Sequence, residues 1–201
     1  MFEKTAENLS KRGFKVYCVK DAKDALKKCL DIIKIDDVPA FAGSETIKQI
    51  GLVEALLERG NEICHRSYLK EGETAQDIMK KSLSADFIVC SANAVTEDGE
   101  MLNVDGTGNR IAATFYGPQN ILFVVGKNKI VRNMAEAFER IKTTAARLNC
   151  IRFGKNTPCV NGGDCADCIN EETICNISAV YHHPPRGKNF YIILVDEELG
   201  Y

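Results

Sequence analysis

Four cysteines lie close together in a polar stretch near the end of the chain, where their spacing is typical of a metal-binding loop. Intervening gaps of five, two and six residues separate Cys159, Cys165, Cys168 and Cys175. The surrounding residues 152–176 are rich in Gly, Asn and Asp, so burial of apolar side chains cannot organise this loop. Long loops without structure of their own are uncommon in compact domains, and a metal held by four thiolates would supply the missing order. The sequence therefore predicts a metal or cluster site at these four cysteines.

The spacing does not decide which metal is bound. Structural zinc sites commonly use two closely spaced cysteine pairs, and here only Cys165 and Cys168 form such a pair. The order of the gaps resembles, in reverse, the compact 4Fe–4S loop of endonuclease-III-type DNA glycosylases. A 4Fe–4S cluster takes four thiolates, so we favour it and keep zinc as the alternative. Redox-active thiols, disulfides and a disordered loop are the other interpretations.

A second group of polar residues follows a buried strand at residues 87–90. A hairpin is expected around Glu97-Asp98-Gly99-Glu100, and a glycine turn at residues 105–108 then leads into a helix. Glycines let a ligand approach the backbone, and free N–H groups at a helix start favour an anion. The expected ligand-binding residues here are Asn93, Thr96, Gly99, Asp105, Gly106, Gly108, Asn109 and Arg110. Arg110 would pair with the anion, while Glu97 or Asp98 would be a base or nucleophile. The alternative is a tight hairpin followed by a helix-capping turn.

Gly43 and Ser44 form a third candidate, at the junction between an apolar strand at residues 38–42 and a helix that runs through residues 47–57. This geometry presents backbone amides and a hydroxyl to an anion. A glycine turn with Ser44 as the helix N-cap explains the same residues, and the two interpretations are compatible.

These residues require a scaffold, and strands that alternate with helices indicate a single α/β domain over residues 1–201. We expect an open, mostly parallel sheet with helices on both faces and residues 120–126 as its central strand. The end strands, 177–182 and 190–195, are expected to add antiparallel character. Cys18 and Cys29 fall on apolar faces and are predicted core residues. A helix over residues 133–148 is expected to bury Met134, Ala137, Phe138, Ile141, Ala145 and Leu148.

The composition excludes several classes of function. A net charge of −2 and a pI near 6.0 give no basic footprint for nucleic acid, and residues 127–129 (Lys-Asn-Lys) are interpreted as a solvated face. There is no apolar run long enough to span a membrane and no apolar segment typical of a signal peptide. Nine cysteines without such a signal favour a reducing compartment, so a cytoplasmic protein is expected.

Three segments resemble a known family. Residues 85–113, the motif Ala42-Gly43-Ser44-Glu45-Thr46-Ile47 with Gly51-Leu52, and the tail 193–201 are similar to the LUD domain of lactate-utilisation proteins. The resemblance is strongest to the stand-alone branch from anaerobic bacteria. It covers nearly the whole chain, although relatives usually carry a longer helical lead-in. It implies a fold similar to that of sugar-phosphate isomerases and CoA transferases, and it implies that residues 43–44 face a pocket.

Three functions follow from these observations. The first is an enzyme, or a relative of one, that binds a small anionic metabolite such as an organic acid, a phosphate or an acyl-CoA. The second is an accessory protein of organic-acid metabolism whose cysteine loop docks with a redox partner subunit. The third is a non-catalytic metabolite sensor with a structural zinc site. Ile111 stands where the third glycine of a dinucleotide fingerprint would lie, so that fingerprint is missing. Catalysis and oligomeric state, a homo-oligomer included, stay open.

Overall fold

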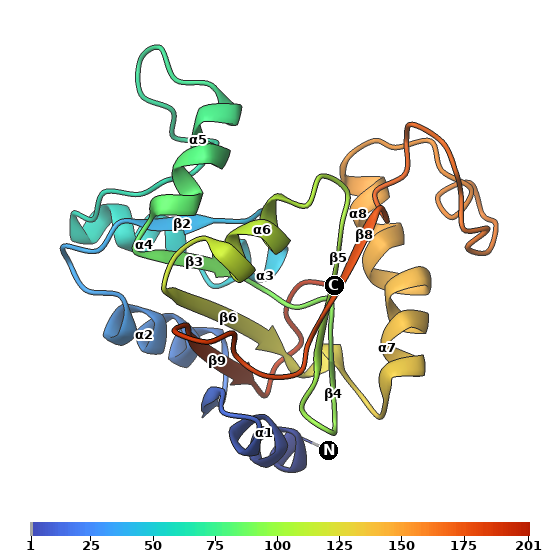
Figure 1. Ribbon diagram of the computed structural model, residues 1–201, viewed down its shortest axis with the longest axis horizontal. Helices are drawn as coiled ribbons and strands as arrows, with labels where there is room; N and C mark the ends of the chain where they lie inside the picture. Colours follow the sequence, from blue (N-terminus) through green and yellow to red (C-terminus); the bar gives the residue numbers. More distant parts are fainter. Residues whose placement is uncertain (1) are drawn as a thin grey trace.

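The computed structural model describes residues 2–201 and is built around a five-stranded sheet in which all neighbouring strands run parallel (Figure 1). Its spatial order is β1 (Lys15–Val19), β9 (Asn189–Val195), β6 (Asn120–Gly126), β3 (Phe87–Cys90) and β2 (Pro39–Phe41). The strongly apolar β6 lies at the centre, and all its residues after the first are buried. The predicted parallel sheet and its central strand are confirmed.

A second, four-stranded sheet packs over the first and was not foreseen as a separate layer. Its order is β7 (Ile130–Val131), β4 (Ala94–Thr96), β5 (Met101–Asp105) and β8 (Ile177–Tyr181). The expected hairpin is present as β4 and β5, and β8 runs antiparallel to β5. The prediction for the other end strand is wrong, because β9 pairs in parallel with β1 and β6 in the main sheet.

Helices cover the two sheets on their outer sides and fill the edges between them. They are α1 (Phe2–Lys11), α2 (Ala22–Ile32), α3 (Glu45–Gln49), α4 (Leu52–Arg59), α5 (Ala75–Lys81), α6 (Asn109–Tyr116), α7 (Met134–Arg140) and α8 (Ala146–Arg152). Single turns of 3-10 helix occupy Ser82–Ser84 and Lys127–Lys129, and a π-turn, Ile141–Ala145, joins α7 to α8. Within residues 2–201, the structure contains no helix that is both long and apolar enough to cross a membrane.

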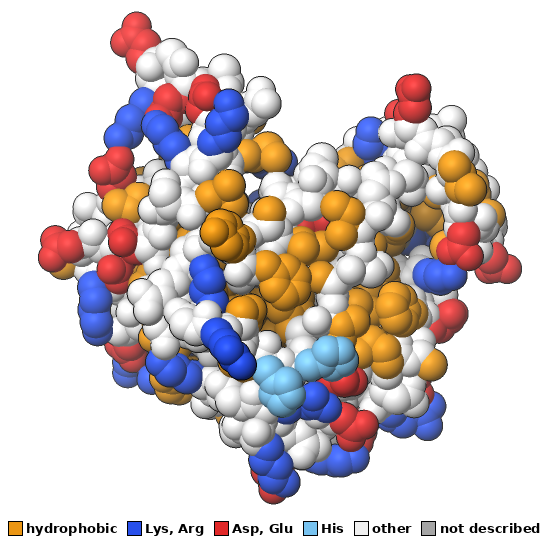
Figure 2. Space-filling model, in the orientation of Figure 1, with side chains coloured by type: hydrophobic (Ala, Val, Ile, Leu, Met, Phe, Trp, Pro, Cys, Tyr) orange, Lys and Arg blue, Asp and Glu red, His pale blue; other side chains and the backbone are white. Residues whose placement is uncertain are grey.

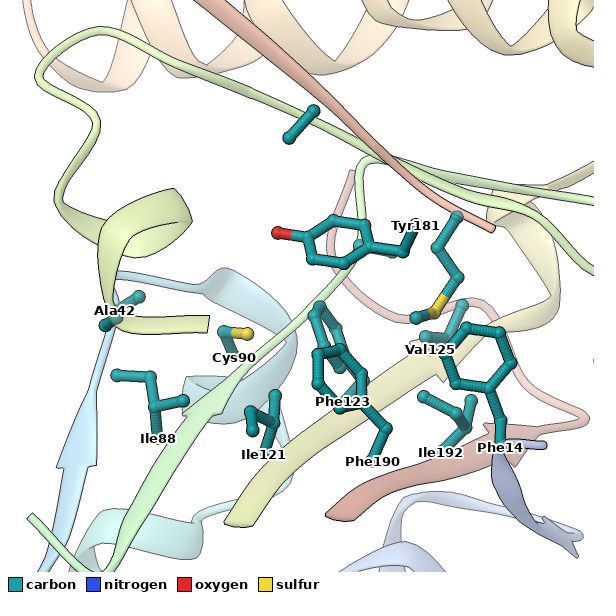
Figure 3. Close-up of a cluster of buried hydrophobic side chains, with 14 of the residues drawn as sticks. Phe14, Ala42, Ile88, Cys90, Ile121, Phe123, Val125, Tyr181, Phe190 and Ile192 are labelled. Carbon is teal, nitrogen blue, oxygen red and sulfur yellow. The ribbon is translucent and has the colours of Figure 1, made fainter. Parts of the chain in front are cut away.

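The period-two alternation of the central strands creates two cores. Val89, Leu122 and Val124 face α2, α3 and α4, where they join one buried cluster. The alternate residues of the same strands face the second sheet, and Phe123 meets Tyr181 of β8 edge to face at 5.7 Å (Figure 3). The outer face of the second sheet packs on α7 through Leu102. One face of the main sheet is therefore covered by helices, and the other mainly by a second sheet.

Several sequence expectations about single elements need correction. Cys29 is fully buried as predicted, but Cys18 is exposed because β1 is an edge strand. The helix expected after Gly43 is divided into α3 and α4 at Gly51, which adopts a φ of +68°. On α7 and α8, Phe138 and Leu148 are 38% and 37% exposed, since they lie outside the narrow stripe that packs on the second sheet.

Candidate functional site

A cavity of about 430 Å³ opens between α5, the end of β5 and α8. In the space-filling view it lies in the hollow between the projection that carries α5 and the one that carries the cysteine loop (Figure 2). Its floor includes the segments that follow β2 and β3, two parallel strands whose carboxyl ends meet at one edge of the sheet. Open α/β sheets commonly bind ligands at such an edge.

The structure brings most of the predicted ligand-binding residues to this cavity. Those that line it are Gly43, Asn93, Asp105, Gly106, Asn109 and Arg110. Ser44 lines a smaller chamber of about 30 Å³, which shares Gly43, Asn93 and Arg110 with the large cavity. Gly108 instead begins α6 with a φ of +76°, and a Cβ there would meet Ile177 at 2.8 Å. The large cavity and the small chamber therefore adjoin and draw on three separate loops.

Arg110 is held by protein groups rather than presented to solvent. Its Nε donates to Oδ1 of Asp105 at 2.8 Å, and its Nη2 donates to the Val104 carbonyl at 2.9 Å. Asp105 in turn accepts from the backbone N–H of Ile111, which joins the start of α6 to the end of β5. The guanidinium therefore positions the cavity wall, although the sequence predicted it as the direct partner of an anion.

Asn93 is the second fixed element of this wall. Its Oδ1 accepts from the backbone N–H of Val104 at 2.8 Å and from Arg110 at 3.2 Å. Its own backbone N–H donates to Oδ1 of Asn103. Asn93 is 8% exposed, so these contacts tie the loop after β3 to the hairpin in a site from which water is largely excluded.

The hairpin tip lies away from the cavity, against α1. Glu97 makes an ion pair with Lys4 at 2.7 Å, which lowers the pKa of its carboxyl, and the Asp98 carbonyl accepts from Arg12. A Cβ at Gly99 would lie 2.6 Å from the backbone of Leu9. Thr96 is buried and accepts from the backbone N–H of Glu100. These four predicted residues, Thr96 to Gly99, thus stay outside the pocket, because β4 and β5 carry the turn away from the strand ends.

Several basic residues at the cavities were not foreseen. Arg152 lines both cavities, where it pairs with Glu45 at 2.8 Å, and its buried Nε has no hydrogen-bond partner among residues 2–201. Arg66 lines the large cavity, and Lys129 lines the small chamber. The interpretation of residues 127–129 as a solvated face is wrong for Lys129, which is 2% exposed. Little in the sequence signalled this burial, because Lys129 lies only two residues after the exposed Lys127, although it directly precedes the buried β7.

The four predicted metal cysteines line one further cavity, of about 860 Å³, together with Cys150 of α8. Residues 155–176 form neither helix nor strand around it. Burial raises the pKa of the Cys150 thiol, and burial together with the neighbouring thiols raises that of Cys175 to about 11. Across residues 2–201, no three His, Cys, Asp or Glu side chains stand together in an arrangement that would hold a metal ion. The thiols share a cavity without being gathered into a coordination shell.

The fold and the cavities define an α/β protein with a partly basic pocket at its strand ends and a thiol-lined cavity beside it. The family model of the LUD domain matches residues 2–195, and the chain belongs to the LUD domain family, as its sequence predicted. No curated protein matches the chain.

One solved structure supports the fold independently. The crystal structure of a DUF162 family protein from Deinococcus radiodurans, determined at 1.70 Å resolution, is similar with a TM-score of 0.57. The match covers 96% of this chain and 94% of that chain at 13% sequence identity. At this identity the likeness concerns the fold alone.

Proposed function

We propose that the protein binds a small anionic metabolite in the large cavity and its adjoining chamber, and that it serves organic-acid metabolism of the lactate-utilisation type. The observation that carries the proposal is a local excess of positive charge. Four basic side chains, three of them arginines, line the two cavities against the two carboxylates of Glu45 and Asp105, in a chain whose net charge is −2, so the excess holds even when Lys129 is neutral. The basic residues are Arg66, Arg110, Lys129 and Arg152. An anionic ligand would balance this excess.

The residues divide into those that hold the site and those that are available to a ligand. Arg110 and Asp105 fix the wall through their mutual ion pair. Arg152 lines both cavities while Glu45 and Asn149 hold its terminal nitrogens, and Arg66 is exposed at the rim of the large one. Glu97 and Asp98 lie at the hairpin tip, so the proposal assigns them no catalytic role, and turnover is a separate question from binding.

Isothermal titration calorimetry with L-lactate, pyruvate, inorganic phosphate and acetyl-CoA tests the proposal. The likeness to sugar-phosphate isomerase and CoA-transferase folds remains a prediction and is the reason for the last two probes. We expect at least one probe to bind with a Kd below about 1 mM, the upper end of the usual range for metabolites. This binding should weaken as salt is added. Arg152→Ala should weaken binding, whereas Arg132→Ala, an exposed partner of Glu136 on α7, should not. Failure of all four probes would remove the proposal.

A second proposal concerns the cysteine loop, and the shared thiol cavity supports it. We propose that Cys159, Cys165, Cys168 and Cys175 hold a 4Fe–4S cluster, with zinc as the alternative. The donor set fits, because these four thiols line one cavity in a loop without helix or strand, and a 4Fe–4S cluster takes four thiolates. A cluster would supply electron transfer to a redox partner subunit, whereas zinc would make the loop a structural element of a metabolite sensor.

Anaerobic purification followed by visible spectroscopy and analysis of iron, sulfide and zinc distinguishes these outcomes. A 4Fe–4S protein should absorb broadly near about 400 nm, bleach with dithionite and contain about four irons per chain. A colourless protein with one zinc per chain would favour the sensor. Protein that binds neither metal, even after reconstitution under reducing conditions, would contradict both versions of the proposal.

A further inference from the structure

Lys129 is a buried lysine in the turn that follows β6, and membership of the LUD domain family does not account for its burial. The small chamber that it lines is formed by the loops after β2 and β3 and by the end of the chain, through Ser44, Ser91 and Tyr201. The final turn covers Lys129 from outside, because a Cβ at Gly200 would lie 3.2 Å from its Nζ. Lysine rarely becomes fully buried without a partner, so its environment calls for a chemical reason.

The hydrogen bonds of Lys129 leave one position on its Nζ open. The amine donates to Oγ1 of Thr46 at 2.7 Å and to Oγ of Ser91 at 3.0 Å. Both hydroxyls donate their own protons to backbone carbonyls, Thr46 to that of Leu199 and Ser91 to that of Val124. Each hydroxyl can therefore only accept from Lys129. The remaining position on Nζ carries a lone pair in the neutral amine and a third N–H in the ammonium form.

Burial and the charges around Lys129 favour the neutral amine above about pH 7 until an anion arrives. Among residues 2–201, Lys129 makes no ion pair with a carboxylate. Burial and the nearby Arg140 and Arg110 lower its pKa to about 7. The other titratable groups around the chamber are Cys90, Tyr201 and Glu45, of which Glu45 is paired with Arg152. Burial raises the pKa of the Cys90 thiol to about 12 and also raises the pKa of Tyr201, so both remain neutral near pH 8.

We propose that Lys129, with Arg152 on the adjoining side, binds the carboxylate group of the metabolite in the small chamber, and that Lys129 takes up a proton when it does so. This inference rests on the anion-binding function proposed above and narrows it to carboxylates. The chamber of about 30 Å³ has room for about two water-sized atoms, which suits the two oxygens of a carboxylate better than the four of a phosphate. The bound anion supplies the negative counter-charge that the buried Lys129 otherwise lacks. It therefore stabilises the ammonium form, whose third N–H can donate to the anion.

Calorimetric titration of the whole protein in buffers of different ionisation enthalpy tests proton uptake directly. The probes are L-lactate, pyruvate, inorganic phosphate and acetyl-CoA. We expect a carboxylate probe to bind with uptake of about one proton near pH 8 and much less near pH 6, where Lys129 is already charged. Lys129→Met should weaken that binding about ten-fold or more, as expected for loss of a charged hydrogen bond. The matched control is Lys127→Met, an exposed lysine in the same 3-10 turn.

The outcomes separate this inference from the function on which it rests. Carboxylate binding without proton uptake near pH 8 would overturn the role of Lys129, and this measurement needs no variant. Binding of phosphate or acetyl-CoA alone would overturn the carboxylate assignment while anion binding itself stands. If none of the four probes binds the wild-type protein, the proposed function fails as well. Unchanged affinity in Lys129→Met would also contradict the inference.

Discussion

The two candidate sites of this protein are neighbours, yet they are built in opposite ways. At the strand-end pocket, Asp105, Asn93 and Arg110 satisfy one another within a hydrogen-bonded wall. In the cysteine loop, Cys165 is exposed, and the residues that carry the four thiols form neither helix nor strand. A wall of this kind is organised before any ligand binds, which lowers the ordering cost of binding. The loop has only local turns, such as the one closed by the Gly163 N–H and the Pro158 carbonyl, and under the proposal above a metal would add order over a longer range.

The two regions nevertheless share a boundary. Ile174 lines both the large cavity and the thiol cavity, and Asn176 donates to the Gly106 carbonyl at 2.9 Å. Ile174 therefore forms part of the pocket wall, and Asn176 supports that wall through its bond to Gly106. A metal that orders this segment would also stabilise one side of the ligand site, so the contrast between the regions is a contrast between linked parts.

The largest loss of stability is expected when Arg110 is removed from the ordered wall, and this variant tests the contrast between the two sites most strongly. Arg110→Ala leaves the Asp105 carboxylate, whose side chain is 6% exposed, without its cationic partner. Breaking a buried ion pair in this way costs about 3–5 kcal/mol of unfolding free energy. Urea denaturation would measure the loss, and Arg66→Ala, which removes an exposed arginine from the same cavity, should cost little. Equal losses in the two variants would show that the wall is not the rigid part.

Much of this wall could be predicted from the sequence, because local patterns determine it. The apolar run of β3, the Asp-Gly hairpin and the glycine turn before α6 all lie where period and turn chemistry placed them. The direction of the hairpin tip could not be predicted, since it depends on the pairing of β5 with the distant β8. The same limit hid Lys129, whose burial depends on the final turn of the chain around Gly200.

The second prediction compares the cost of an added side chain at two glycines that have similar backbone φ angles. Gly99, at the hairpin tip, has a φ of +81° and no room for a Cβ, whereas Gly162, in the cysteine loop, has a φ of +84° and nothing within 4 Å. Alanine at either site costs about 1 kcal/mol of backbone strain, but at Gly99 steric overlap adds about 1–3 kcal/mol. Thermal or urea unfolding of Gly99→Ala and Gly162→Ala measures the difference. Similar stabilities would contradict the close packing of the hairpin tip on α1.

A third prediction concerns the pH dependence of stability. The folded-state pKa of Lys129 is about 7, below the value of 10.5 in the unfolded chain, so between these values the unfolded state binds more protons. Stability should therefore rise with pH, by about 1.5 kcal/mol between pH 7 and 8.5, through this group alone. Urea unfolding of wild type and Lys129→Met across that range isolates the contribution, since other groups cancel in the difference. Parallel curves would show that Lys129 stays charged in the folded protein.

The smallest change in the free energy of unfolding is expected in the cysteine loop. It tests directly whether the loop, unlike the pocket wall, contributes little to the stability of the metal-free fold. In metal-free protein, Cys165→Ala removes an exposed thiol from an unstructured segment and should change the free energy of unfolding by less than about 0.5 kcal/mol. Cys150→Ala is the matched control, because that thiol is 2% exposed on α8 and its removal should cost about 1 kcal/mol or more.

The same two variants should reverse their order in metal-loaded protein. Cys165→Ala removes a proposed ligand, so it should lower the bound metal and the stability that the metal confers, whereas Cys150→Ala should retain the metal. Metal analysis and unfolding of both variants, with and without chelator, provide the measurement. If Cys165→Ala cost more than about 1 kcal/mol without metal, the loop would be packed as part of the fold. The pocket and the loop would then be two preformed sites, and the loop would need no organiser.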